Sequence, residues 1–210
     1  MGSDDISTAK VRTRRLVSVA LARLSPSRRR AAGVALAQRL AELPAVREAR
    51  VLMAFLSLSS EIDTWPIIRW AWGEGKRIVV PRVEPSGEAG PPMTERTIVP
   101  VLLEEAGVES VAAHPAVRTS DLGIPEVPDG RPVPVAEIDA LLVPCQAVDR
   151  RGYRLGKGGG FYDRFLALPD LRAAVMAVGF QEQILDEVPF AAHDRRVPMV
   201  VTDAETISFA

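Results

Sequence analysis

The chain has 210 residues, which suits one well-buried domain, and its 47% hydrophobic and 25% charged content is ordinary for a soluble globular protein. A formal net charge of −1 gives no basis for a nucleic-acid or membrane partner. The single cysteine excludes an internal disulfide, and no apolar run resembles a membrane span or a secretory leader, so we expect a cytoplasmic protein. We expect one domain over residues 6–210, after a loose terminal segment at residues 1–5.

A proline-free stretch over residues 10–24 predicts the first helix. Its apolar stripe comprises Val17, Leu21 and Leu24. Continued toward the N-terminus at helical spacing, this stripe reaches Arg14 and Lys10, so two cations extend the buried face. Either these cations have a function there, or they reach solvent at the helix end, which is the commoner fate of basic side chains.

A second helix is predicted to begin at Ser25-Pro26, which are favoured starting residues, and to end before Pro44. The run Arg28-Arg29-Arg30 is expected on a solvated face of this helix. Residues 50–56 form a continuous apolar run, which is typical of a strand covered on both faces.

A polar loop at residues 57–64 joins this strand to a helix predicted over residues 65–72. Glu61 in the loop has two interpretations. It is either an acidic residue stabilised by the dipole of the following helix, or a carboxylate at the carboxyl end of a strand, where open α/β sheets bind ligands.

The middle of the chain is less regular. Residues 78–81 predict a strand, and residues 84–97 predict a mobile surface loop because they are rich in Pro, Gly, Glu and Ser. A further strand is expected over residues 97–103, although Pro100 weakens the prediction. Residues 104–138 contain many prolines and predict no clear element.

The C-terminal third returns to alternating elements. Short apolar runs predict strands at residues 140–144, 173–180 and 199–202, and residues 161–168 place their apolar side chains on one side of a helix. Strands that are separated by helices and apolar on both faces predict an α/β sandwich with a largely parallel sheet.

The most informative segment is the loop at residues 149–160, which ends in a glycine-rich turn before a helix. Its closely spaced glycines are Gly156, Gly158, Gly159 and Gly160. Glycine permits positive φ angles and close backbone approach, and free amides at the following helix start favour an anion. Arg154 and Lys157 are expected as mobile cations on the rim. Together these features predict a phosphate cradle.

Neither familiar phosphate motif is present. No GK[ST] closes a P-loop, and Phe161 stands where the dinucleotide fingerprint needs its third glycine. The alternative is a glycine loop that only turns the chain. Asp163 favours the cradle because a carboxylate beside bound phosphates can hold magnesium, although its simpler role would be to complement the helix dipole.

The segment from Val143-Pro144 through Asp149 and Gly152 to Arg154-Leu155-Gly156 and Tyr162-Asp163 resembles the signature of the 5-formyltetrahydrofolate cyclo-ligase (5,10-methenyltetrahydrofolate synthetase) family. The resemblance extends over most of the chain. It implies a three-layer α/β/α sandwich that is Rossmann-like, with a largely parallel sheet. We expect a monomer or a weak dimer.

The resemblance implies that the protein converts 5-formyltetrahydrofolate, with ATP and Mg²⁺, into 5,10-methenyltetrahydrofolate, ADP and phosphate through a phosphorylated formyl intermediate. Two alternatives are a non-catalytic folate- or nucleotide-binding relative and a small-molecule kinase with another acceptor. Pro198 favours the first alternative, since family members commonly have Asp there. The retained carboxylate at Asp163 argues against it, because a binding module needs no metal ligand.

The resemblance also implies the site residues. ATP is expected to contact Lys10, Arg14, Arg154, Leu155, Gly156, Lys157, Gly158, Gly159, Gly160, Phe161 and Tyr162. The folate substrate, with or without a polyglutamate tail, is expected to contact Leu56, Glu61, Lys157 and Phe161. Magnesium is assigned to Asp163 and Asp194. Lys157 and Arg154 are the expected catalytic residues, with Lys157 between the γ-phosphate and the formyl oxygen.

Other chemistries lack support. His114 and His193 form no Ser-His-Asp arrangement with a motif around a serine, and no Cys/His spacing suits zinc. Cys145 is expected to be a small buried hydrophobic residue and not a nucleophile.

Overall fold

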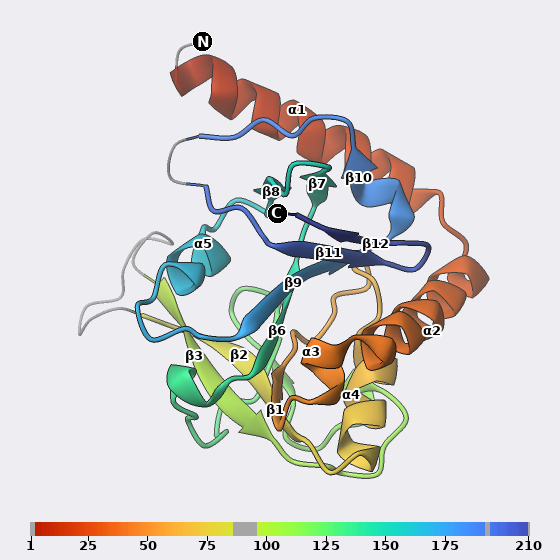
Figure 1. The fold of residues 1–210 in the computed structure, drawn as a ribbon, viewed down its shortest axis with the longest axis vertical. Coiled ribbons are helices and arrows are strands. Elements are labelled where there is room, and N and C mark those ends of the chain that lie inside the picture. The colour runs from red at the N-terminus through yellow and green to blue at the C-terminus, as the bar shows by residue number, and fades with distance from the viewer. Residues whose placement is uncertain (1–2, 86–95, 192–193, 210) are drawn as a thin grey trace.

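The computed structural model describes residues 3–85, 96–191 and 194–209 and contains a seven-stranded sheet of order β12-β11-β9-β6-β1-β2-β3 (Figure 1). The strands are β1 (Val51–Met53), β2 (Arg77–Pro85), β3 (Arg96–Leu103), β6 (Ala140–Pro144), β9 (Ala174–Gly179), β11 (Met199–Thr202) and β12 (Thr206–Ser208). The central strands from β11 to β2 pair in parallel, while β12 and β3 add antiparallel edges. The predicted α/β fold with a largely parallel sheet is confirmed.

Helices cover both faces of the sheet. They are α1 (Ser3–Ala22), α2 (Pro26–Glu42), α3 (Pro44–Arg47), α4 (Trp65–Gly73) and α5 (Phe161–Leu166), with single 3-10 turns at Val111–Ala113, Val135–Glu137 and Gln181–Gln183. Strand side chains alternate between the two cores: Leu52 belongs to the core that includes residues of α1, α2 and α4, whereas Met53 belongs to the core that includes Phe165 of α5 and Ile138. This alternation produces the predicted three layers.

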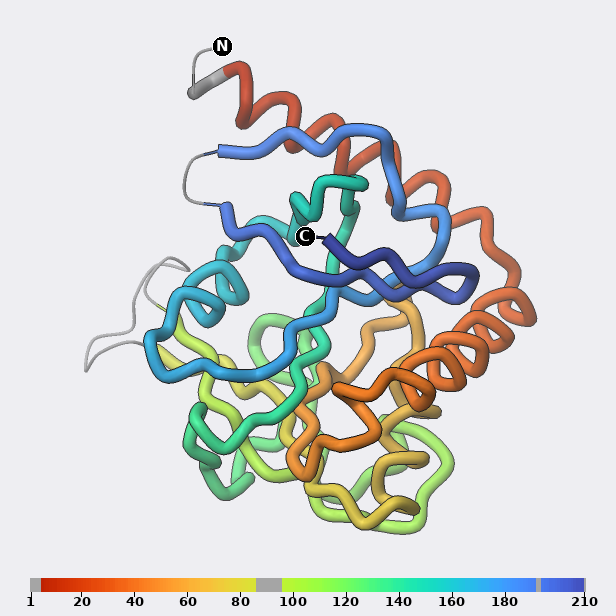
Figure 2. Tube along the Cα trace, in the orientation of Figure 1, coloured from red at the N-terminus to blue at the C-terminus, as the bar shows by residue number. Residues whose placement is uncertain are grey.

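Short strands complete the fold. A three-stranded sheet joins β10 (Ile184–Leu185), β7 (Ala147–Asp149) and β8 (Arg154–Leu155), and β4 (Arg118–Thr119) pairs with β5 (Pro125–Glu126). Helix α1 contacts β7 and the turn that precedes β10, although it is far from both in sequence. Figure 2 shows this N-terminal helix beside the chain that runs toward Asp194.

Several element boundaries differ from the predictions. Helix α1 begins at Ser3 and so takes in part of the expected loose terminus. The predicted 50–56 strand is only three residues long because the chain leaves the sheet after Met53 to form a loop. Helix α5 ends at Leu166 instead of 168. The 97–103 strand is present, and its Pro100 is accommodated because β3 is an edge strand.

Two further predictions concern surface segments. The run Arg28-Arg29-Arg30 is not a solvated face throughout: Arg28 forms ion pairs with Glu182 and Asp203, and Arg29 donates to the Leu21 carbonyl. The ends of the expected 84–97 loop belong to strands β2 and β3, and residues 86–95 lie outside the described residues. Within the described part of the chain, no helix is long and apolar enough to cross a membrane.

Helix α2 offers a direct test of packing in the core that contains Leu52. Leu36 is fully buried and Val34 on the same helix is exposed. We expect Leu36→Ala to lower the free energy of unfolding by about 2–5 kcal/mol, since it removes buried methyl groups and leaves a cavity. Val34→Ala should change it by less than about 0.5 kcal/mol. Urea denaturation followed by circular dichroism measures both, and equal losses would contradict this packing.

Candidate active site

The fold contains a switch point between β1 and β6. These strands are parallel neighbours, but the chain continues from β1 to β2 on one side and from β6 to β9 on the other. Ligands of open α/β sheets bind at the carboxyl ends of strands at such a point. A cavity of about 830 Å³ opens there, lined by residues at or just after the carboxyl ends of the two strands, including Phe55, Leu56, Pro144 and Cys145.

The cavity collects all the residues predicted for the site. It is lined by Lys10, Arg14, Leu56, Glu61, Arg154, Leu155, Gly156, Lys157, Gly158, Gly159, Gly160, Phe161, Tyr162, Asp163 and Asp194. They come from α1, from the loop after β1, from β8, from the glycine loop with the start of α5, and from the segment before β11. His193 lies outside the described residues.

The glycine loop follows β8 and curls against α1. Arg14 Nε donates a 2.8 Å hydrogen bond to the Gly156 carbonyl, and a Cβ on Gly158 would lie 3.7 Å from the Arg14 guanidinium. Gly158 and Gly160 have φ angles of +113° and +66°, which side-chain-bearing residues rarely adopt. The glycines are therefore required by the backbone path itself, and they leave the loop without side chains toward the cavity at these positions.

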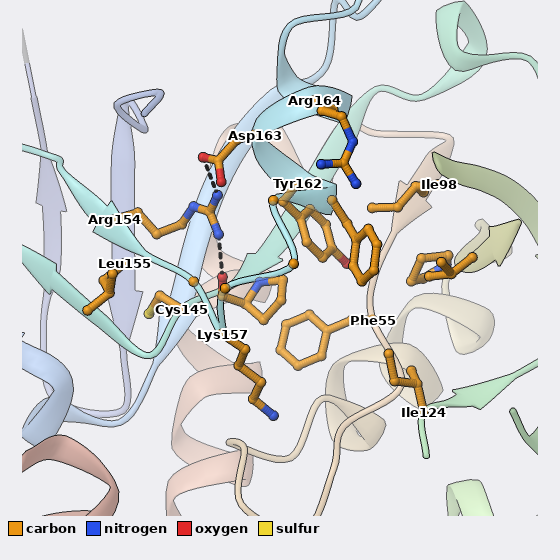
Figure 3. Close-up of a pocket in the computed structure, with 18 of the residues that line it drawn as sticks. Phe55, Ile98, Ile124, Cys145, Arg154, Leu155, Lys157, Tyr162, Asp163 and Arg164 are labelled. Carbon is orange, nitrogen blue, oxygen red and sulfur yellow. Dashed lines mark hydrogen bonds and ion pairs between the residues drawn. The ribbon is translucent and has the colours of Figure 1, made fainter. Parts of the chain in front are cut away.

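Arg154 differs from the prediction of a mobile rim cation, which is wrong. Its side chain is only 2% exposed. Nη1 donates to the Pro144 carbonyl at 3.1 Å and Nη2 donates to Asp163 Oδ1 at 2.9 Å (Figure 3). The guanidinium is therefore a fixed charge that joins the end of β6 to α5.

A second ion pair joins distant parts of the chain. Lys10 Nζ lies 2.5 Å from Asp194 Oδ2, and the same carboxylate oxygen accepts a hydrogen bond from the Ala191 amide. Burial lowers the pKa of the neighbouring Arg14, while the charge of Asp194 opposes that shift. Both cations of α1 thus extend the buried face, as the helical spacing predicted. The ion pair between Lys10 and Asp194 was not predicted.

A third ion pair lies in the cavity between the loop after β1 and the glycine loop. Lys157 Nζ is 2.9 Å from Glu61 Oε1, and Glu61 Oε2 accepts the Leu58 amide at 2.8 Å. The Lys157 side chain is 44% exposed, whereas that of Glu61 is 13% exposed. Glu61 is thus held in place, and Lys157 is the partner that has room to move.

One side of the cavity is apolar, and sequence reasoning missed most of it. Its members are Phe55, Pro81, Val83, Ile98, Leu122, Ile124 and Pro125. Figure 3 shows Phe55, Ile98 and Ile124 on the side away from Arg154 and Asp163. These residues come from the loop after β1, from β2 and β3, and from the β4–β5 hairpin. No motif links them, so only the tertiary fold reveals this wall.

Tyr162 places a hydroxyl in a buried position. Its Oη has no hydrogen-bond partner among the described residues. Burial raises the pKa of this phenol, the charge of Glu61 adds to the shift, and Arg154 opposes it. The phenol therefore stays neutral and retains a proton to donate.

The acidic residues fit magnesium only together with a phosphate ligand. Among the described residues, no group of three or more His, Cys, Asp or Glu side chains is arranged to hold a metal. Asp163 pairs with Arg154, and Asp194 pairs with Lys10. Because Mg²⁺ commonly takes one or two carboxylates plus phosphate oxygens and water, these residues suit an ion that arrives with a nucleotide, not a closed protein site.

Pro198, where the sequence departs from the family pattern, lies away from this chemistry. It is exposed, does not line the cavity, and accepts a hydrogen bond from the Phe209 amide through its carbonyl. The substitution therefore removes no side chain from the cavity wall.

Fold and cavity together define a Rossmann-like α/β protein with a cavity at the sheet's switch point that is lined by glycines and cationic side chains. A model of the 5-formyltetrahydrofolate cyclo-ligase family matches residues 6–203, and the chain belongs to that family.

Relatives and solved structures agree with this assignment. The 5-formyltetrahydrofolate cyclo-ligase of Escherichia coli strain K12 is 28% identical over 183 residues, covering 87% of this chain and 93% of that protein. The enzyme of the same name from Mus musculus is 26% identical over 208 residues, covering 96% and 97%. The NMR structure of Aquifex aeolicus 5,10-methenyltetrahydrofolate synthetase has the same fold, with a TM-score of 0.75 at 24% identity over 95% of this chain and 92% of that one.

Cys145 lines the cavity, and its reactivity tests whether its thiol is buried. Burial raises the pKa of this thiol from 9.0 to about 12. We expect iodoacetamide at pH 9 to label the native protein far more slowly than the guanidinium-unfolded protein, because the thiolate is the reactive form.

Since the unfolded thiol ionises above pH 9 and the folded one does not, this group should destabilise the fold as pH rises from 9 toward 12. Cys145→Ala should remove that component, and rapid native labelling would contradict the burial.

Proposed function

We propose that the protein converts 5-formyltetrahydrofolate into 5,10-methenyltetrahydrofolate with hydrolysis of ATP to ADP and phosphate, in the presence of Mg²⁺. Family membership supports the reaction class. The observation that carries the proposal is the junction of two unlike half-sites in one cavity: Lys157 of the glycine loop forms an ion pair with Glu61 beside the apolar wall. An enzyme that phosphorylates a folate needs its nucleotide and pterin sites to meet in this way.

The nucleotide half-site consists of fixed charges and bare backbone. Lys10, Arg14 and the glycine loop would bind the phosphates of ATP, and Arg154 would support them through its bonds to the Pro144 carbonyl and Asp163. Asp163 and Asp194 would hold magnesium together with the phosphates, and the ion would offset their charge. Such sites act by positioning and charge stabilisation, so no protein nucleophile is required.

The folate half-site combines one carboxylate with an apolar wall. Glu61 can accept paired hydrogen bonds from the N–H and amino groups of a pterin ring. Leu56 and Phe161 line the cavity near it, and Phe55 and Ile124 extend the apolar surface that an aromatic substrate would contact. A hydroxyl is not needed at position 161, since phenylalanine stands there.

The proposed chemistry has two steps. The formyl oxygen attacks the γ-phosphorus of ATP, ADP leaves, and the product is an iminophosphate, which turns a poor leaving group into phosphate. The 10-nitrogen then attacks the former formyl carbon, loses its proton, and expels phosphate to close the ring. Lys157 would stabilise the negative charge on the formyl oxygen as it bonds to the γ-phosphorus. It belongs to the glycine loop and forms an ion pair with Glu61 of the folate half-site.

The central test follows near-ultraviolet absorbance of the methenyl product. Wild-type protein should form product from 5-formyltetrahydrofolate only when both ATP and Mg²⁺ are present. Asp163→Asn should lower kcat/KM by about 100-fold or more, because a preorganised charge interaction is lost. Glu137→Gln, on the surface at the opposite end of the sheet, serves as the matched control and should behave as wild type. ATP consumption without folate would point to a kinase, and saturable binding without product would indicate a non-catalytic relative.

Lys157 is tested separately. Lys157→Ala should lower kcat more than it raises the KM for either substrate, since the cation is proposed to act on the developing phosphoryl bridge. Lys157→Arg keeps the charge and should retain part of the rate. Full turnover by Lys157→Ala would exclude the proposed role.

A further inference from the structure

Asp149 is a fully buried carboxylate that lies outside the cavity lining. It is the last residue of β7, and its side chain is 0% exposed. Oδ1 accepts hydrogen bonds from the amides of Arg151 at 2.9 Å and Tyr153 at 3.1 Å. Oδ2 accepts the Val188 amide at 3.1 Å and the guanidinium of Arg151 at 2.8 and 3.1 Å.

The two oxygens serve two different segments. Oδ1 shapes the turn that leads directly into β8 and the glycine loop. Oδ2 holds Val188, which belongs to the segment that follows β10 and leads to Asp194. Each segment carries a charged group into the nucleotide half-site, Arg154 in the first case and Asp194 in the second.

Further contacts extend from the segment of Val188 to Asp194. Strand β10 pairs in parallel with β7, with Leu185 opposite Asp149. Phe190 stacks on Tyr153 with ring centroids 3.7 Å apart and an interplanar angle of 12°. The Ala191 amide then donates to Asp194 Oδ2. A continuous series of contacts thus runs from Asp149 to the carboxylate that pairs with Lys10.

We propose that Asp149 is a positioning residue that fixes the separation between the glycine loop and Asp194, and thereby the affinity of the site for MgATP. The proposal rests on the proposed function of the nucleotide half-site. A carboxylate is required because a buried neutral amide has one acceptor oxygen and cannot receive hydrogen bonds from both segments. Asp149 does not touch the substrates.

Asp149→Asn should break the connection to Val188 and keep the one to the turn before β8. Its remaining oxygen can still accept the Arg151 and Tyr153 amides, but its NH₂ group would face the Val188 amide, donor against donor. We expect the half-saturating concentration of MgATP to rise about 10-fold or more, as for the loss of a residue that orients a metal ligand, with the folate KM close to wild type. The Val188 amide should lose its protection in hydrogen exchange measured by NMR.

Two controls separate positioning from general stability. Asp139→Ala removes a carboxylate whose Oδ2 also accepts backbone amides, those of Arg50 and Val51, but away from the cavity. It should lower stability without changing the MgATP dependence. Arg151→Met removes the ion pair and leaves the Val188 connection, and it should retain wild-type MgATP affinity.

A second variant applies if Asp149→Asn does not fold. Val188→Pro deletes the amide donor and also replaces a fully buried valine side chain, and residue 188 precedes Pro189, so its backbone already favours extended angles that proline tolerates. It should raise the half-saturating MgATP concentration in the same way. Unchanged MgATP binding by calorimetry in either variant, or a uniform fall in kcat with unchanged MgATP dependence, would overturn the proposal. Because binding and exchange need no turnover, these results stand apart from a failure of the proposed reaction.

Discussion

The site depends on one buried charge, the guanidinium of Arg154. Placing an ion in the interior costs several kcal/mol unless it is paired and hydrogen-bonded. Arg154 is paired through Asp163 on α5 and donates to the Pro144 carbonyl at the end of β6, while its Nε has no hydrogen-bond partner among the described residues. The glycine loop between these points has few side chains of its own to define its shape. The ion pair therefore links the two ends of the loop, and Arg14 holds its first glycine through the Gly156 carbonyl.

The rest of the cavity follows from the order of the strands. The chain continues in opposite directions from β1 and β6, so the segments that leave their carboxyl ends diverge and keep a space between them. The loop after β1 supplies Glu61 and the start of the apolar wall, while the glycines and Lys157 come from the loop after β8, in the segment between β6 and β9. Two chemically different half-sites thus arise from adjacent strands, and the Lys157–Glu61 ion pair marks their meeting point.

Local patterns predicted the parts of the site that lie together in the sequence. Glycines with positive φ, a helix start and an acidic residue one turn later are short-range features, and the 154–163 segment lies where they indicated. The apolar wall was not predictable, since Ile98 and Ile124 reach the cavity from an edge strand and a hairpin that have no shared motif. Arg154 was mistaken for a surface cation because sequence shows that a residue is charged and not whether the fold supplies its partners.

The ion pair between Lys10 and Asp194 joins residues 184 positions apart. Closing so long a loop costs conformational entropy before the contact contributes anything, so the pair forms only when the intervening sheet already brings the two segments together. The first helix therefore emerges from the ribosome long before the residue that completes its charged face. The Lys10–Asp194 pair therefore needs nearly the whole chain, and a chain interrupted between residues 163 and 194 would carry its glycine loop without the carboxylate that faces α1.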